Sequence, residues 1–176
     1  MADNTWIANA QGVAYAANKH MLALFNATSS ARYIRVYKAL LLNNNTSAVT
    51  GVLNTARIYS LTTSMSGGTA VTPISMVSAN SALDANTTAG HNVSTTLGSI
   101  LRQLLHSPDE PVVTTLDWDS IGCLIPFATW WDTGYGDANV QPFTMAPSEN
   151  RGFSIYSVTQ TVGTADLEIL FTDKAS

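Results

Sequence analysis

The sequence predicts an all-β protein, a single antiparallel β-sandwich or jelly roll with at most one short helix. Three observations predict this fold class. Apolar and polar residues alternate with a period of two in several stretches, Ser, Thr and Asn supply most of the polarity, and strands do not alternate regularly with helical segments. Threonine and other β-branched residues favour strands. The 176 residues suffice for one domain with a hydrophobic core.

The first residues, "MADNTWIANAQGVAYAANK", contain mostly small side chains and no strong period. We expect residues 1–11 to form an extended arm, anchored by Trp6 and Ile7 and lacking a core of its own. Such an arm becomes ordered when a neighbouring subunit supplies the surface. The folded domain is then expected to span residues 12–176 and to remain folded when the arm is deleted.

Strands are predicted next. Residues 19–27, "KHMLALFNA", are expected to form a short buried strand. Residues 33–42 and 52–61 are rich in β-branched and aromatic side chains at a period of two, so they predict two long strands. The polar connector 43–51 joins them either as a hairpin or as a pair that crosses between sheets.

The middle of the chain has weaker signals. Residues 77–94 are polar with few large apolar side chains, so we expect them to lie on the surface. Residues 95–107 are the one helix candidate, because five apolar residues recur at spacings of three and four and Pro108 follows. These residues are Leu97, Ile100, Leu101, Leu104 and Leu105.

The end of the chain predicts two further strands inside the sheets, at residues 153–158 and 167–172, joined through the short connector "TVGT". In the second strand, residues that point to one face of the sheet alternate with residues that point to the other face. Leu167, Ile169 and Phe171 form one face, and Asp166, Glu168 and Leu170 form the other.

The low charge of the chain argues against direct nucleic-acid binding. Charged residues make up 11% of the chain and the net charge is −4, against about 25% charged residues in an average domain. Arg32, Arg35 and Lys38 form the densest basic group, but a strand would place them on both faces, so direct nucleic-acid binding is not expected. The sequence shows neither a signal peptide nor an apolar run that could span a membrane. A weakly charged surface favours coverage by further copies of the chain or by a partner.

Few residues predict chemistry. The three histidines, His20, His91 and His106, share no ligand spacing, and Cys123 is the single cysteine, expected to be a small buried residue. Asp117 and Asp119 fall on one face of a strand. They fit an acid/base pair, a calcium site or a solvated strand edge beside Trp118, and we favour the strand edge. We therefore expect no enzymatic activity and no cofactor.

The segment "TWWDTGYGD" contributes Trp130, Trp131 and Tyr135. Large aromatic side chains beside acidic and amide groups occur in domain cores, at the centres of protein interfaces and in saccharide-binding clefts. All three alternatives stay open, and we expect at least one of these rings to be buried against the core or another chain. The candidate interface residues are therefore Trp6, Ile7, Trp130, Trp131 and Tyr135.

The order of features resembles small jelly-roll virion proteins of tailed phages. The resemblance is carried by "KHMLALFNA", "RVYKALLLNNNTSAVTGVLNTARIYSLTT", "TPISM", "SPDEP", "WWDTGYGD" and "GFSIYSVTQTVGTADLEILFT". It implies a virion protein made in the host cytoplasm, most simply a capsid decoration or cement protein on the head exterior.

Two kinds of partner follow from that resemblance: further copies in a homotrimer, and the major capsid protein. The arm would then run along an adjacent subunit or the capsid surface. The alternative is a receptor- or glycan-binding jelly-roll module of a phage tail or fibre, because the same fold hosts both functions.

Overall fold

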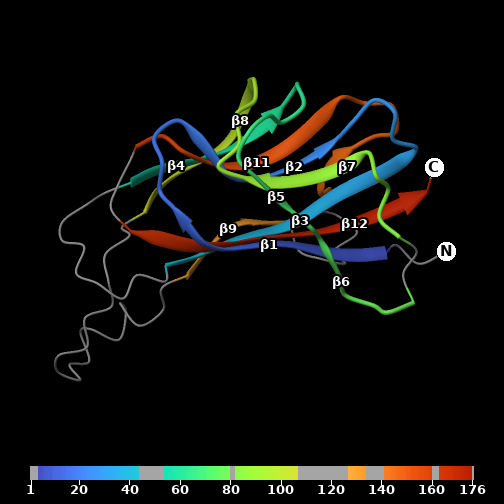
Figure 1. Ribbon diagram of the computed structural model, residues 1–176, viewed down its shortest axis with the longest axis horizontal. Coiled ribbons are helices and arrows are strands. Elements are labelled where there is room, and N and C mark those ends of the chain that lie inside the picture. Colours follow the sequence, from blue (N-terminus) through green and yellow to red (C-terminus); the bar gives the residue numbers. More distant parts are fainter. Residues whose placement is uncertain are drawn as a thin grey trace.

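The computed structural model describes residues 4–43, 54–79, 82–106, 127–133, 141–159 and 163–175. These residues form two antiparallel sheets packed face to face, which confirms the predicted β-sandwich (Figure 1). Within these ranges there is no helix, and hence none that is long and apolar enough to cross a membrane.

Within the described residues, each sheet has six strands. Sheet A consists of β1 (Asn4–Ala14), β3 (Arg32–Asn43), β6 (Ile74–Ser75), β9 (Phe127–Asp132), β10 (Phe143–Met145) and β12 (Thr164–Ala175). Sheet B consists of β2 (Lys19–Asn26), β4 (Asn54–Leu61), β5 (Thr69–Val71), β7 (Thr87–His91), β8 (Leu97–His106) and β11 (Arg151–Ser157). Sheet A has the order β10-β3-β12-β1-β6, with β9 also paired to β3, and sheet B has the order β5-β7-β2-β11-β4-β8.

The strand pairing is nested, and this identifies the jelly roll. β1 pairs with β12, β2 with β11, β3 with β9 and β10, and β4 with β8, all antiparallel. The chain therefore has the topology of one long hairpin rolled up so that successive pairs of strands along the hairpin fall in opposite sheets. β5, β6 and β7 are additions inserted between β4 and β8.

The predicted long strands are confirmed. β3 and β4 lie in different sheets, so the pair crosses between the layers and does not form a hairpin. β11 and β12 likewise belong to sheets B and A and occupy interior positions in them, as expected. The connector at 44–53 lies outside the described residues.

The inner faces of the two sheets form the main core. Its large buried side chains include Trp6, Leu22, Leu24, Ile34, Leu41, Ile58, Phe153 and Phe171. Burying each such side chain stabilises the fold by about 1.5 to 3 kcal/mol. A second cluster covers the outer face of sheet B. It contains Phe25, Tyr59, Leu61, Val93 and Tyr156, with Met65 packed against it.

The predicted helix at 95–107 is wrong, because this segment contains β8, an edge strand that pairs with β4. The register between β8 and β4 shifts twice, between Ile58 and Tyr59 and between Tyr59 and Leu61. Each irregularity interrupts the period of two. The leucines consequently recur at three and four residues although the segment is extended.

The predicted arm is also wrong. β1 pairs with β12 from Asn4, opposite Asp173, to Ala14, opposite Thr164, so residues 4–14 belong to the domain. The expected boundary between residues 11 and 12 falls at a bulge inside this strand. There Gly12 has φ +61° and donates its backbone N–H to Asp166 Oδ1 at 2.7 Å.

The expectation of a purely surface segment at 77–94 is partly wrong, because β7 lies within it and pairs with β2 and β5. The loop before β7 is tied to the domain by Asp84. Its carboxylate accepts hydrogen bonds from the Asn86 N–H at 2.9 Å and the Ser30 hydroxyl at 3.2 Å. These contacts, led by the Asn86 N–H, lower the pKa of Asp84.

Candidate functional site

Trp6 and Ile7 are neighbours on β1 and project to opposite faces of sheet A. Trp6 is 7% exposed and packs in the main core, opposite Phe171 in the register. The expectation that it anchors an arm on a neighbouring subunit is therefore wrong. Ile7 is half-buried on the outer face, where its cross-strand neighbours are Leu170 and Ile74.

Trp131, on β9, packs against the main core. Its ring lies 5.5 Å from that of Phe153 with an interplanar angle of 69°, an edge-to-face contact. The Trp131 side chain is half-buried by this contact, so the core is one surface that the aromatic segment contacts. Trp130 is on the same strand, but its side chain lies outside the described residues, and so does all of Tyr135.

The outer face of sheet A carries an apolar row. Ile74 on β6, Ile7 on β1, Leu170 on β12 and Lys38 on β3 are successive cross-strand neighbours, and we call them the middle row. The Lys38 ammonium lies 3.5 Å from the Asp132 carboxylate on β9. The solvent-facing side of an antiparallel sheet is usually polar. Three large apolar side chains in line make this face suitable for a contact.

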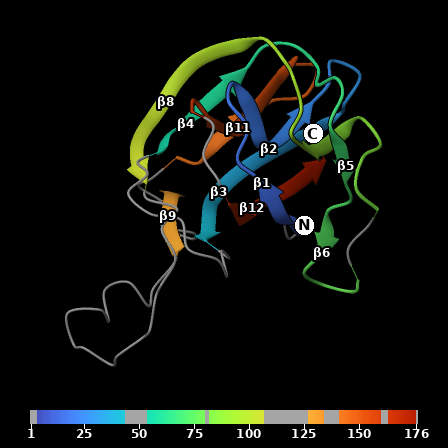
Figure 2. The ribbon, with the colours of Figure 1, turned by 60° about the vertical axis from the view of Figure 1, so that its left-hand side comes forward.

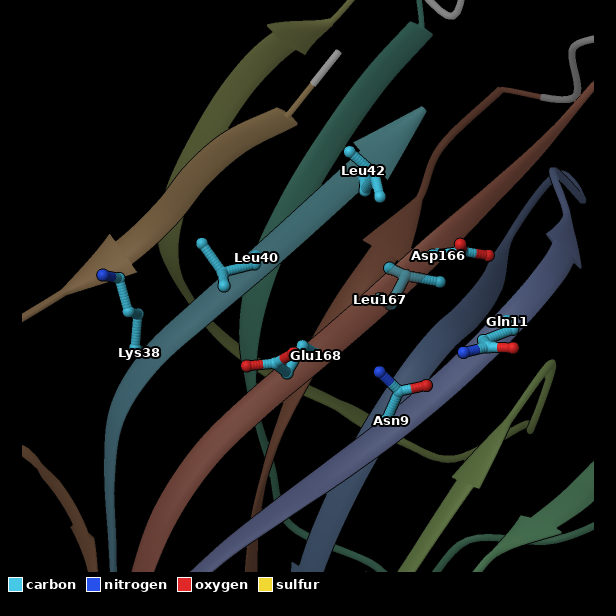
Figure 3. A pocket seen from close by; sticks show the side chains of 8 residues that line it. All are labelled: Asn9, Gln11, Lys38, Leu40, Leu42, Asp166, Leu167 and Glu168. Atoms are coloured by element: carbon cyan, nitrogen blue, oxygen red, sulfur yellow. The ribbon is translucent and has the colours of Figure 1, made fainter. Parts of the chain in front are cut away.

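A groove of about 400 Å³ lies on the same face, next to the middle row (Figure 3). It is lined by Asn9, Gln11, Lys38, Leu40, Leu42, Asp166, Leu167 and Glu168, which come from β1, β3 and β12. Amide and carboxylate groups therefore stand beside leucines. No Ser, His or Cys lines the groove, and across the described ranges no group of three or more His, Cys, Asp or Glu could hold a metal ion.

An apolar segment begins at β6. Ile74 is 63% exposed, Met76 54% and Val77 51%. The segment is tied to the edge of sheet A by pairing with β1 and by a hydrogen bond from the Met76 N–H to the Thr5 carbonyl at 2.9 Å. Figures 1 and 2 show it at the rim of the sandwich beside β1. We call residues 74–77 the apolar edge.

One pair resembles catalytic machinery but is structural. His20 Nδ1 lies 2.8 Å from Ser154 Oγ, and the His20 ring makes an edge contact with Tyr156 at 4.9 Å. Both His20 and Ser154 are buried, so no substrate reaches them. Burial lowers the pKa of His20 to about 4. The pair therefore holds β2 and β11 together on the outer face of sheet B.

Comparison with known proteins identifies no relative, since no family model, no curated protein and no solved structure matches the chain. The fold and the surfaces therefore define its class. The chain is a jelly-roll β-sandwich with one sheet face covered by a second apolar cluster and the other carrying an apolar row and a groove.

The sequence did contain a signal for the outer face of sheet A. Asp166, Glu168 and Leu170 alternate with the buried residues of β12, which places them together on the other side of that strand. The sequence does not reveal which strands flank β12. For that reason the alignment of Leu170 with Ile7, and of Glu168 with Asn9 and Leu40, becomes visible only in the structure.

Proposed function

We propose that this chain is a structural protein of a virion, a decoration or cement protein that binds the exterior of a phage head and stabilises it. The observation that carries the proposal is the apolar edge. Three large side chains, each more than half exposed, lie within four residues. Exposed apolar clusters of this kind mark protein contacts. The resemblance to small virion proteins and the jelly-roll topology agree with it.

The proposed partners are the major capsid protein and further copies of this chain. The apolar edge is the attachment to the shell, because it lies at the rim of the sandwich and leaves most of both sheet faces available for other contacts. The proposal assigns no catalytic role and no cofactor. It places the protein in the virion after synthesis in the host cytoplasm.

Reconstitution tests the attachment. Heads from a phage lacking this gene are mixed with purified protein, and bound protein is measured after sedimentation. Wild-type protein is expected to bind saturably, and the variant Ile74→Ser/Met76→Ser/Val77→Ser is expected to lose at least about tenfold in affinity. The matched control is Leu97→Ser/Ile100→Ser, which removes two exposed apolar side chains from β8 instead. Equal binding by the apolar-edge variant, or recovery of the protein only with tails, would overturn the proposal.

A homotrimer is part of the proposal. Its support is the resemblance and the low charge of the chain, which weakens repulsion between copies. Light scattering after gel filtration, together with image reconstruction of decorated heads, measures the copy number. A monomer at high micromolar concentration, with no three-fold cluster on the particle, would contradict the trimer.

The groove favours a second candidate function, binding of a saccharide by a tail or fibre module. Asn9, Gln11 and Glu168 present planar polar groups of the kind that bind sugar hydroxyls, beside the apolar surface of Leu40. A glycan array probed with the purified protein distinguishes the two functions. Saccharide binding that is lost in Asn9→Ala/Gln11→Ala, with no binding to heads, would replace the decoration proposal.

A further inference from the structure

The outer face of sheet A has an ordered charge pattern along its strands. On the side of the middle row toward the start of β12, the charged groups are the carboxylates Asp166 and Glu168. On the other side, toward the end of β12, they are Arg35 on β3 and Lys174 on β12. The face therefore has an acidic end, an apolar centre and a basic end.

We infer that this face binds the same face of a second copy of the chain, related by a two-fold axis that runs along the middle row. Such an axis reverses the strand direction and keeps each strand above its own counterpart. The acidic end of each copy then meets the basic end of the other, so the interface contains two such contacts. At the centre, Ile7 contacts Ile7 of the second copy, and Leu170 contacts Leu170 of the second copy.

The register makes the complementarity specific. Asp166 and Lys174 are each four residues from Leu170 along β12, in opposite directions, so the axis places them opposite each other. Glu168 is opposite Thr172, whose cross-strand neighbour is Arg35. An axis parallel to the strands would instead set carboxylates against carboxylates. Charge therefore selects one of the two symmetric arrangements.

The axis also sets Lys38, the charged member of the middle row, against Lys38 of the second copy. Each ammonium lies 3.5 Å from the Asp132 carboxylate of its own chain, so the charges at this end of the row are balanced within each copy. The remaining members are apolar, and Leu40 and Leu42 continue the apolar surface beside them. Burial of these side chains supplies the attraction, and the charged ends determine the orientation.

The face is large enough for a specific contact. Nine residues at about 3.3 Å each, on β1, β12 and β3 at about 4.8 Å spacing, cover about 430 Å². The shorter β6 and β9 add about 130 Å², which gives about 560 Å² of flat sheet per copy, or about 1,100 Å² for the pair. This is the lower limit of specific interfaces, so the affinity is expected to be moderate. Ile74 belongs to both the middle row and the apolar edge, so the two-fold contact is tested on purified protein in the absence of heads. The contact can pair two trimers as readily as two monomers.

Charge exchange between two variants tests the inference by analytical ultracentrifugation. Glu168→Lys alone and Arg35→Glu alone each create like-charge contacts at both ends, so each is expected to weaken pairing by about tenfold or more. An equimolar mixture of the two variants restores opposite charges at both ends, and its pairing is expected to return to within about threefold of wild type. A structural defect in either variant would not be repaired by mixing.

Two further variants complete the test. Arg102→Glu, on an exposed position of β8, changes the net charge as Arg35→Glu does and is expected to leave pairing unchanged. Leu170→Ser removes the apolar centre and is expected to weaken pairing while the circular dichroism spectrum stays that of wild type. The inference is overturned if wild-type protein does not pair at 100 µM (roughly the range for weak complexes). It is also overturned if the mixture stays as weak as its components, or if the charge variants change only binding to heads or saccharides.

Discussion

At the scale of single residues, His20 couples stability to pH. In the unfolded chain its pKa has the ordinary value of 6.5, and in the fold burial lowers the pKa to about 4. As the pH falls from 6.5 to 4, the unfolded chain binds a proton that folded His20 does not. The free energy of unfolding therefore decreases by on the order of 2 to 3 kcal/mol as the pH falls through this window. Above pH 6.5 the protein keeps this part of its stability in full.

Urea unfolding between pH 7.5 and 4 measures this effect. His20→Asn provides the comparison, because the amide can still hydrogen-bond to Ser154 but does not titrate. The variant is expected to be less stable at pH 7, through lost contact with Tyr156, and to show a flatter pH dependence between 6.5 and 4. Asp84 does not confuse the result, since its lowered pKa places its contribution below that window. Parallel pH profiles for the two proteins would contradict the assignment.

Individual residues also show what the sequence leaves open. The sequence predicts Trp6 as the anchor of an arm on a neighbouring subunit, and it leaves core, interface and saccharide site open for Trp131. In the structure Trp6 is buried in the core of its own chain and Trp131 packs against that core. What the sequence could not give was the identity of the surface that buries them. Aromatic side chains fit a core, an interface or a saccharide site equally well until their neighbours in space are known.

At the scale of elements, the sequence predicts the strands that are rich in large β-branched and aromatic residues. β3 is among them although its register with β12 shifts next to Leu170. The sequence does not predict β1, which Gly12 interrupts, or β8, whose register with β4 shifts twice. The inward side chains Ala8 and Ala10 also gave β1 a weak hydrophobic signal, although both are buried. Pairing with β12 determines the structure of β1 more than its own residues do.

Deletion of residues 1–11 is expected to unfold the protein. Within sheet A, β1 lies between β12 and β6, so its removal takes Trp6 from the core and leaves one edge of β12 without a partner strand. Losing a large buried ring alone costs about 3 to 5 kcal/mol, against a total stability of about 5 to 15 kcal/mol for most domains.

Thermal melting followed by circular dichroism tests this expectation. The control is deletion of residues 1–3, which precede β1 and are expected to be dispensable. A truncation at residue 11 that melts cooperatively at the wild-type temperature would show that β1 is an accessory strand, as an arm would be.

At the scale of the whole molecule, the jelly roll brings the two ends of the described chain together. Asn4 is the cross-strand partner of Asp173, and Figure 1 shows the N- and C-termini on the same side of the sandwich. The pairings of β1 with β12 and β2 with β11 join residues that are far apart in sequence. Such contacts make folding slow, because the chain loses the entropy of loop closure before the pairing of the distant strands supplies any stabilising energy.

Backbone cyclisation through a short Gly/Ser linker should therefore stabilise the protein. The ends are already adjacent in the fold, so the linker introduces little strain, whereas the unfolded chain loses the entropy of its free ends. Loop-closure models give a gain of about 5 kcal/mol for a loop of this length. Folding should also become faster, because β1 and β12 start close together.

Stopped-flow folding and equilibrium unfolding in urea measure both effects, with the linear chain carrying the same linker residues as the control. If stability rises through the unfolded state, as the loop-closure argument requires, the gain appears mainly in the folding rate and the unfolding rate stays nearly constant. A gain confined to the unfolding rate would mean that β1 and β12 pair only after the transition state. Loss of stability would mean that the two ends are not neighbours in solution, which would contradict the pairing of Asn4 with Asp173 on which the nested topology depends.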